Sequence, residues 1–344
     1  MQPGQYLASL RMNRMPIEPD RHRTGSQITF TGVGKTYANA PRPSVHDVSL
    51  TIEPGEFVVL LGPSGCGKTT LLKMVNRLIE PTSGTIELDG RDIRSLKTEH
   101  LRRGIGYVIQ QTGLFPHMRI EDNVAVVPSL LGWDKRRISG RVDELLTLVG
   151  LPPDDYRRRY PSQLSGGEQQ RVGLARALAA DPSTMLMDEP FGALDAITRT
   201  RLQTELLQIH QQIGKTILFV THDIDEAVRL ADRIVVMRAG AVVQYATPLE
   251  IIMHPADDFV RDLVGADDVL RRLGLILISE VMSALTVPSS ETIPASETLR
   301  AGLGRLMETG LSILTVVDDD GQPIGEIGLT QVLDASQSAE RMSP

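Results

Sequence analysis

Long apolar runs and cysteines are what this 344-residue sequence most lacks. No run approaches the roughly 18 consecutive apolar residues that a membrane-spanning helix needs. Residues 1–26 contain arginines but no apolar segment of the kind that secretion signals carry. These absences predict a soluble, non-secreted chain. Because Cys66 is the single cysteine, the sequence also excludes disulfides within the chain and cysteine-based zinc sites.

Extended basic stretches are absent as well. The formal net charge is −7, and residues 265–344 contain five Arg, no Lys and twelve Asp or Glu, so the residues before them balance to zero. Short basic runs at 135–137 and 157–159 are typical of solvated helix faces. This distribution argues against nucleic acid as a partner. The chain does have 41% apolar residues and more than the usual length of one domain, which suffices for a large core.

A phosphate-binding loop is the first motif with a specific chemistry. An apolar run from Phe57 to Leu61 predicts a buried strand, and Thr70 begins a predicted helix. The residues between them fit G-x-x-x-x-G-K-[ST], in the order Gly62, Pro63, Ser64, Gly65, Cys66, Gly67, Lys68, Thr69. Glycines let backbone N–H groups approach phosphate oxygens, and a helix N-terminus adds partial positive charge. We expect Lys68 to bind the β- and γ-phosphates of a nucleotide and Thr69 to bind Mg²⁺, with Thr70 beside them.

A second apolar strand, predicted at residues 184–188, ends in the carboxylates Asp188 and Glu189. Paired acids at a strand end are often only solvated caps, but the phosphate loop upstream favours a catalytic role. Asp188 is then placed to hold Mg²⁺ through its water shell. Glu189 is placed to orient and deprotonate the attacking water.

Between these two strands lies the segment Leu164-Ser165-Gly166-Gly167-Glu168-Gln169-Gln170-Arg171. With it, residues from about Ile28 to Phe259 resemble the ATP-binding subunits of ATP-binding-cassette (ABC) transporters. The resemblance implies that the signature residues close over the ATP of a partner subunit; these are Ser165, Gly166, Gly167 and Glu168. It also implies single roles for three further residues: adenine stacking for Tyr37, a contact across the dimer for Asp195, and a contact with the γ-phosphate for His222.

The resemblance further implies a glutamine that senses the γ-phosphate and the metal. Gln110 and Gln111 compete for this catalytic and metal-binding role, and the spacing to Leu114-Phe115-Pro116-His117 favours Gln110. The stretch from Gln110 to Met118 is the expected docking groove for a cytoplasmic helix of a membrane permease.

Periodicity and resemblance together predict an α/β fold, a P-loop ABC cassette over residues 27–265 preceded by an N-terminal extension at 1–26. A small antiparallel sheet is expected from residues 27–53, and a helical subdomain from about 112–164. The predicted strands of a mostly parallel sheet with helices on both faces are 57–61, 105–109, 184–188, 217–221 and 233–237.

Residues 270–335 predict a separate small α+β domain, followed by a tail at 336–344. An amphipathic helix near 298–307, a strand, an acidic turn at Asp318-Asp319-Asp320-Gly321, a second strand and a short helix are similar to one cystathionine-β-synthase-type (CBS) motif. Such motifs occur as tandem pairs, and this sequence contains one. The motif must therefore pair with the copy in a second subunit or be a remnant without a ligand site.

The stretch from Tyr107 to Met118 and the CBS-like segment resemble the ATPase subunits of importers for glycine betaine, choline, carnitine and related osmoprotectants. This implies ATP and Mg²⁺ as cofactors, a head-to-tail dimer with a second copy, an integral membrane permease, and an extracytoplasmic solute-binding protein as an indirect partner. The chain is then expected at the cytoplasmic face of the membrane as a peripheral subunit. An importer for a sugar or an amino acid is one alternative. A soluble ABC ATPase of DNA repair or translation is another, although the zinc-binding cysteines, long coiled-coil insertions or two fused cassettes of such proteins are absent here.

Overall fold

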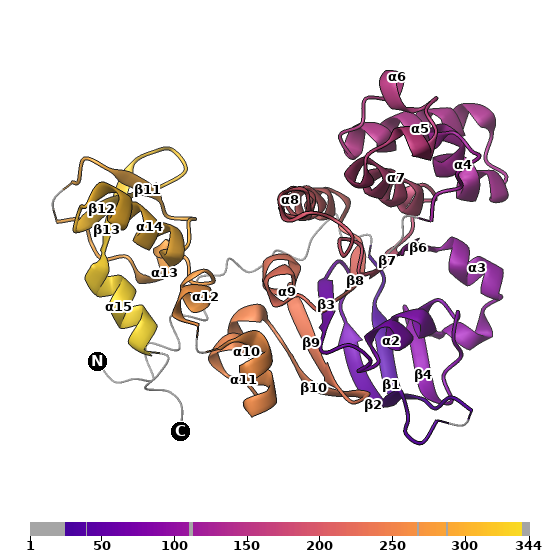
Figure 1. The fold of residues 1–344 in the computed structure, drawn as a ribbon, viewed down its shortest axis with the longest axis horizontal. Coiled ribbons are helices and arrows are strands. Elements are labelled where there is room, and N and C mark those ends of the chain that lie inside the picture. The colour runs from indigo at the N-terminus through magenta and orange to yellow at the C-terminus, as the bar shows by residue number, and fades with distance from the viewer. Residues whose placement is uncertain (1–24, 39, 110–112, 267, 287, 339–344) are drawn as a thin grey trace. The chain divides into compact units, whose positions relative to one another are not determined.

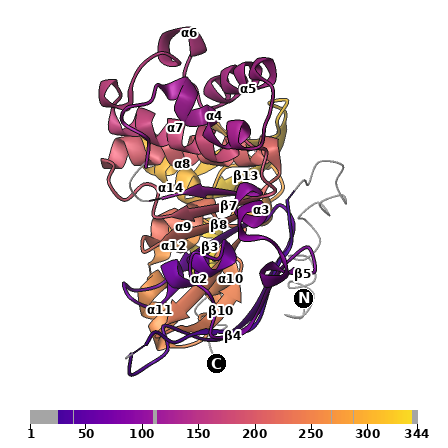
Figure 2. The same ribbon diagram turned by 90° about the vertical axis from the view of Figure 1, so that its right-hand side faces the viewer.

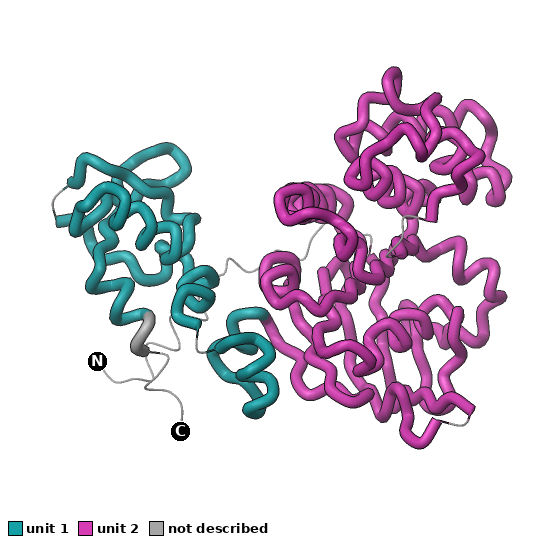
Figure 3. Tube along the Cα trace, viewed as in Figure 1, with its two compact units in different colours: residues 1–20, 248–344 teal, residues 21–247 magenta. Residues whose placement is uncertain are grey.

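The computed structural model describes residues 25–38, 40–109, 113–266, 268–286 and 288–338 (Figure 1). The chain divides into two compact units, an N-terminal unit that ends at Thr247 and a C-terminal unit that begins at Pro248 (Figure 3). The sequence predicted a boundary near residue 265. Two helices before that position, α10 (Pro248–Met253) and α11 (Asp258–Val264), instead belong to the C-terminal unit. They join the C-terminal unit because α10 packs against both α11 and α12 (Val269–Leu273).

A six-stranded sheet in the order β10-β9-β3-β8-β7-β6 forms the centre of the N-terminal unit. Its strands are β3 (Phe57–Leu61), β6 (Ile105–Val108), β7 (Thr184–Asp188), β8 (Thr216–Thr221), β9 (Arg233–Arg238) and β10 (Ala241–Ala246). Neighbouring strands are parallel except for the β9-β10 hairpin. Every residue of β3 and β8 is buried, so both faces of the sheet are covered, as expected for long apolar runs in parallel strands. The mostly parallel sheet predicted from the sequence is confirmed, while β10 was not among the predicted strands.

Helices of the N-terminal unit pack on this sheet or follow its strands. They are α2 (Lys68–Val75), α3 (Thr98–Arg103), α8 (Ala196–Ile213) and α9 (Ile224–Leu230). Helix α2 contacts β7 and β8, and α9 contacts β3 and β8. The first turn of α2 therefore lies next to the carboxyl ends of several parallel strands, which is the edge where ligands bind in open α/β sheets.

A smaller antiparallel sheet in the order β2-β1-β4-β5 lies at one end of the N-terminal unit (Figure 2). Its strands are β1 (Ile28–Lys35), β2 (Val45–Ile52), β4 (Ser83–Leu88) and β5 (Arg91–Asp92), and the short 3-10 helix η1 (Ile93–Ser95) follows. Its buried residues, among them Ile28, Phe30 and Ile86, join one apolar core with residues of β3, β8 and α2. The predicted antiparallel sheet is thereby confirmed, and it includes β4 and β5 in addition to the predicted segment.

The helical subdomain forms a lobe at the opposite end of the N-terminal unit (Figures 1 and 2). It consists of α4 (Ile120–Leu130), α5 (Lys135–Leu148), α6 (Pro153–Tyr156), the 3-10 helix η2 (Pro161–Gln163) and α7 (Gly166–Leu178). Helices α4, α5 and α7 pack against one another, and α7 also contacts β6. The lobe is thus connected to the edge of the large sheet through the helix that follows the signature residues.

The C-terminal unit has its own three-stranded sheet and its own apolar core. Besides the three helices named above, it contains α13 (Ile278–Val281), β11 (Thr292–Pro294), α14 (Leu299–Thr309), β12 (Ile313–Val317), β13 (Pro323–Gly328) and α15 (Leu329–Ser338). Strand β11 pairs parallel with β12, and β13 pairs antiparallel with it. The predicted order of helix, strand, acidic turn, strand and helix is observed, while β11 was not predicted.

No helix within the described ranges is both long and apolar enough to span a membrane.

Candidate active site

The phosphate loop connects the end of β3 to the start of α2. Gly67 has φ +108°, and a Cβ there would collide with the carbonyl oxygen of Ser44; a Cβ on Gly62 would collide with that of Met237. Only glycine fits these two positions, so the motif is required by the fold as well as by phosphate chemistry. Lys68 is buried, and its Nζ donates to the carbonyl oxygens of Gly62 at 2.7 Å and Pro63 at 3.0 Å. The ammonium group is thereby held over the loop that would surround the phosphates.

Thr69 and Asp188 lie together at the carboxyl edge of the sheet. The Thr69 Oγ1 hydroxyl donates to Asp188 Oδ1 at 2.8 Å, and Lys73 Nζ lies 3.9 Å from Asp188 Oδ2. One hydroxyl and one carboxylate beside a phosphate loop suit Mg²⁺, which takes few protein ligands and completes its octahedron with phosphate oxygens and water. The described residues contain no cluster of three or more His, Cys, Asp or Glu that could hold a metal by themselves. Lys73, one helical turn beyond Thr69, was not identified from the sequence.

Glu189 and His222 face each other across the ends of β7 and β8. Glu189 Oε1 lies 3.3 Å from His222 Nδ1. Glu189 has φ +45°, a left-handed conformation that non-glycine residues rarely adopt and that is typical of functional sites. Hydrogen bonds on both sides hold it there, from Glu189 N to Val220 O at 3.0 Å and from Gly192 N to Glu189 O at 3.2 Å. The backbone therefore directs this carboxylate away from the strand and towards His222.

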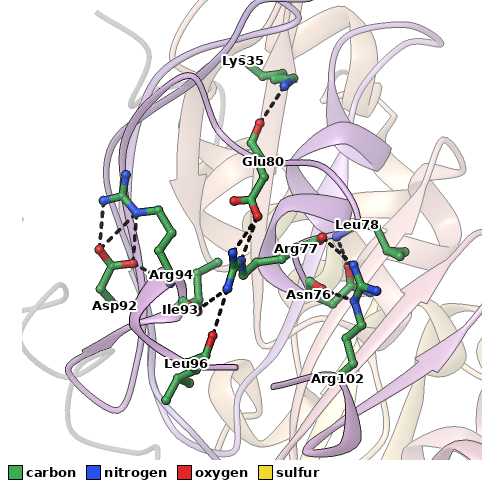
Figure 4. Close-up of polar contacts among 10 residues, drawn as sticks. All are labelled: Lys35, Asn76, Arg77, Leu78, Glu80, Asp92, Ile93, Arg94, Leu96 and Arg102. Atoms are coloured by element: carbon green, nitrogen blue, oxygen red, sulfur yellow. Dashed lines mark hydrogen bonds and ion pairs between the residues drawn. The ribbon is translucent and has the colours of Figure 1, made fainter. Parts of the chain in front are cut away.

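Two arginines hold the far end of α2 (Figure 4). Arg102 donates to the carbonyl oxygens of Asn76 at 3.1 Å and Arg77 at 2.7 Å, which terminate the helix. Arg77 in turn donates to the carbonyl oxygen of Leu96 at 3.0 Å and bonds Glu80. Cationic donors at a helix C-terminus satisfy its last carbonyls and complement its dipole. Arg102 thus ties the C-terminal end of α2 to α3, a role that spacing in the sequence does not indicate.

The signature residues form the N-terminus of α7. Ser165 is the N-cap, and its backbone N–H and hydroxyl donate to Glu168 Oε2 at 2.7 Å and 2.8 Å. Tyr156 donates its hydroxyl to Glu168 Oε1 at 2.6 Å, and this bond holds the pKa of Glu168 below its ordinary value. Both oxygens of the Glu168 carboxylate therefore accept hydrogen bonds from neighbouring residues, which favours a role in holding the conformation of the signature segment. The N–H groups of Gly166 and Gly167 at the helix start remain suited to an anion.

The other predicted site residues lie at separate places. Tyr37 is 41% exposed in the antiparallel sheet region after β1, with Lys35 Nζ 5.3 Å from its ring centroid. Asp195 caps α8 by accepting from Thr198 N at 3.0 Å, and this hydrogen bond holds its pKa below its ordinary value. Gln110 lies outside the described residues, as does its competitor at position 111. The roles given to all these residues remain predictions.

The comparisons with known families point to one class of protein. The family model for ABC transporters matches residues 45–192. The osmoprotectant import ATP-binding protein OsmV of Salmonella typhimurium is 47% identical over 86% of this chain and 77% of its own length. The glycine betaine uptake system ATP-binding protein YehX of Escherichia coli is 47% identical over 89% of this chain and 99% of its own length. The choline transport ATP-binding protein OpuBA of Bacillus subtilis is 52% identical over 71% of this chain and 64% of its own length.

A solved structure extends the similarity to three dimensions. The dimeric post-hydrolysis state of the ATP-binding cassette MJ0796, bound to ADP and Pi, has a TM-score of 0.57 and 34% sequence identity. It covers 64% of this chain and 98% of its own.

Proposed function

Because this chain belongs to the ATP-binding subunits of ABC transporters, we propose that it powers the import of a quaternary-amine osmoprotectant such as glycine betaine, choline or carnitine. The ATPase activity follows from the family and from the site at the phosphate loop. The substrate class is supported by relatives that are named for these solutes and are 47% or 52% identical to this chain over the aligned residues. That similarity over most of the chain is the observation that carries the proposal.

Hydrolysis is assigned to residues at the carboxyl edge of the large sheet. Lys68 and the N–H groups of the phosphate loop bind the β- and γ-phosphates of ATP. Thr69 and Asp188 would hold Mg²⁺, which neutralises charge on the phosphate oxygens. Glu189 takes the proton from the attacking water, and His222 contacts the γ-phosphate. Gln110 completes the site as the residue that senses γ-phosphate and metal.

A second copy of the chain is needed to complete each ATP site in this proposal. Two copies meet head to tail, so that ATP lies between the phosphate loop of one copy and the segment Ser165–Gly167 of the other. Asp195 contacts the opposite copy, and Tyr37 stacks on the adenine. Closing of the two copies on ATP moves a membrane permease. After hydrolysis the negative charges of the products repel across the interface, and the two copies separate again. The subunit is peripheral on the cytoplasmic face of the membrane, and the solute reaches the permease from an extracytoplasmic binding protein.

A single CBS-like motif is proposed for residues 270–335, within the C-terminal unit. Its order of elements and its separate apolar core support this assignment. The ATP-binding domain is proposed to span residues 27–265, with the N-terminal extension at 1–26 and the tail at 336–344 outside both.

The substrate is tested with the solute-binding protein encoded beside the permease gene. Calorimetry against glycine betaine, choline, carnitine, maltose and a panel of amino acids should give tight binding of a quaternary amine only. Such a cation has no N–H to donate, so aromatic side chains and cation–π contacts are the expected means of binding. With the permease in vesicles, the loaded binding protein should then stimulate ATP hydrolysis by this chain. Tight binding of a sugar or an ordinary amino acid would instead support the alternative importer.

A further inference from the structure

Arg199 contacts both chain segments that lead away from the Glu189–His222 pair. From the first turn of α8, its Nη2 donates to the carbonyl oxygen of Leu194 at 3.1 Å. Its Nη1 lies 3.6 Å from Asp223 Oδ2. Leu194 belongs to the loop that leaves Glu189, and Asp223 directly follows His222. One guanidinium group thus joins the two loops that carry the pair.

The Asp223 carboxylate serves two purposes with separate oxygens. Oδ1 accepts from the backbone N–H groups of Asp225 at 2.9 Å and Glu226 at 3.2 Å, which caps α9. Oδ2 faces Arg199. Because the planar guanidinium presents donors in fixed directions, it sets the separation of its two acceptors more strictly than an ammonium group can. Arg199 therefore orients the start of α9 relative to the loop from β7.

A second contact also joins α8 to α9. One turn further along α8, Gln203 Nε2 donates to the buried Glu226 Oε1 at 3.0 Å. Arg199 Nε is itself buried and has no hydrogen-bond partner among the described residues. A buried donor left without a protein partner is a cost to stability. The side chain is therefore better explained by the geometry that it imposes on the two loops than by stabilisation of the helix pair.

We propose that Arg199 is a positioning residue that holds Glu189 and His222 at their working distance during ATP hydrolysis. This inference rests on the roles proposed for Glu189 and His222. Since neither acceptor of Arg199 lies in the phosphate loop, its loss should affect the hydrolytic step and leave ATP binding intact.

The test is steady-state ATP hydrolysis by the full chain with Mg²⁺, comparing Arg199→Ala with the matched control Arg201→Ala. Arg201 lies on the same helix, its side chain is 66% exposed, and among the described residues it makes one ion pair, at 3.7 Å to Glu205. We expect Arg199→Ala to lower kcat about tenfold with the KM for ATP changed by less than about twofold, and Arg201→Ala to match the wild type. Arg199→Lys should restore part of the loss, because lysine keeps the positive charge but lacks the rigid planar fork of the guanidinium.

A double-mutant cycle with Asp223→Asn separates positioning from general damage. Asparagine keeps the helix cap and removes the charge that faces Arg199. Each single variant is expected to be about tenfold slower than the wild type. If both residues act through the Arg199–Asp223 ion pair, the double variant should also be about tenfold slower, whereas independent effects would multiply to about a hundredfold. Should Arg199→Ala fail to fold, as judged by thermal unfolding, Arg199→Lys replaces it in the cycle.

Two results would overturn the inference: a kcat of Arg199→Ala equal to that of Arg201→Ala, or multiplicative losses in the cycle. Glu189→Gln is assayed in parallel. If Glu189→Gln hydrolyses ATP at the wild-type rate, the proposed catalytic roles fail together with the inference. If Glu189→Gln is slow while Arg199→Ala matches its control, the inference about Arg199 alone is wrong.

Discussion

The hydroxyl of Thr69 donates a hydrogen bond of 2.8 Å to Asp188, a residue 119 positions further along the chain. This contact joins the phosphate loop to the end of a strand that is not its neighbour, since β8 lies between β3 and β7. It places a hydroxyl and a carboxylate where the β- and γ-phosphates of ATP would bring a metal ion.

Asp188→Asn is expected to weaken metal use while leaving the nucleotide in place. The amide keeps the shape of the side chain but removes the negative charge that would attract Mg²⁺ through its water shell. The Mg²⁺ concentration for half-maximal ATPase activity should rise on the order of tenfold or more, the effect expected when a metal-holding group is lost. A titration of ATPase rate against Mg²⁺ measures this, with binding of a fluorescent ATP analogue in EDTA as the control. An unchanged Mg²⁺ requirement would contradict the metal role.

Glu189→Gln is expected to separate hydrolysis from binding. A glutamine cannot take a proton from water, so the rate should fall by a factor on the order of 10² or more while ATP stays bound and the dimer stays closed. Lys68→Ala should instead lose ATP binding itself, because the ammonium group over the loop is removed. Phosphate release and sedimentation with ATP distinguish the two variants. Wild-type hydrolysis by Glu189→Gln would exclude Glu189 as the base.

Tyr156→Phe is expected to destabilise the signature loop in a pH-dependent way. The Tyr156 hydroxyl holds the pKa of Glu168 below its ordinary value of 4.5. A carboxyl whose pKa is depressed by folding adds stability above its unfolded pKa and loses it as the pH falls through the folded value. The Tm of Tyr156→Phe should therefore lie below that of the wild type at pH 7, and the gap should narrow well below pH 4.5. A gap that stays constant between pH 7 and pH 3 would indicate lost packing instead.

Removal of the CBS-like segment of the C-terminal unit is expected to weaken the dimer without nucleotide. Large apolar side chains of that unit are exposed, including Met307 at 75%, Ile324 at 42% and Ile313 at 37%. A single CBS-like motif would cover such exposed apolar side chains by pairing with the second copy. Light scattering without ATP should show a smaller dimer fraction for a chain ending at Gly265 than for the full chain. The same dimer fraction in both would leave the unit without this role.

The motifs that the sequence identifies are those whose chemistry is local. The glycines of the phosphate loop, the signature segment from Ser165 to Glu168, and the apolar strand before Asp188 each depend on residues a few positions apart. The positive φ at Gly67 is a backbone requirement of this local kind, which the residue type itself indicates. The mostly parallel sheet could be predicted for the same reason, because each buried strand is a short apolar run.

Contacts between distant segments were decided only by the tertiary structure. The strand order puts the ends of β7 and β8 side by side, which brings Glu189 close to His222. The hydrogen bonds of Arg102 to the end of α2 and of Arg199 to Leu194 likewise form only in the folded chain. Arginine occurs both on solvated helix faces and in structural contacts. Residue type and spacing therefore do not show which arginines make such contacts. Strands β10 and β11 were not predicted because their pairing depends on neighbouring strands. Every residue of β10 is only half-buried, so its sequence lacks the apolar run of a buried strand. The sequence alone therefore determined which chemical groups this protein has available. Strand order and helix packing decided which of these groups meet, because their meeting depends on contacts between segments far apart in the chain.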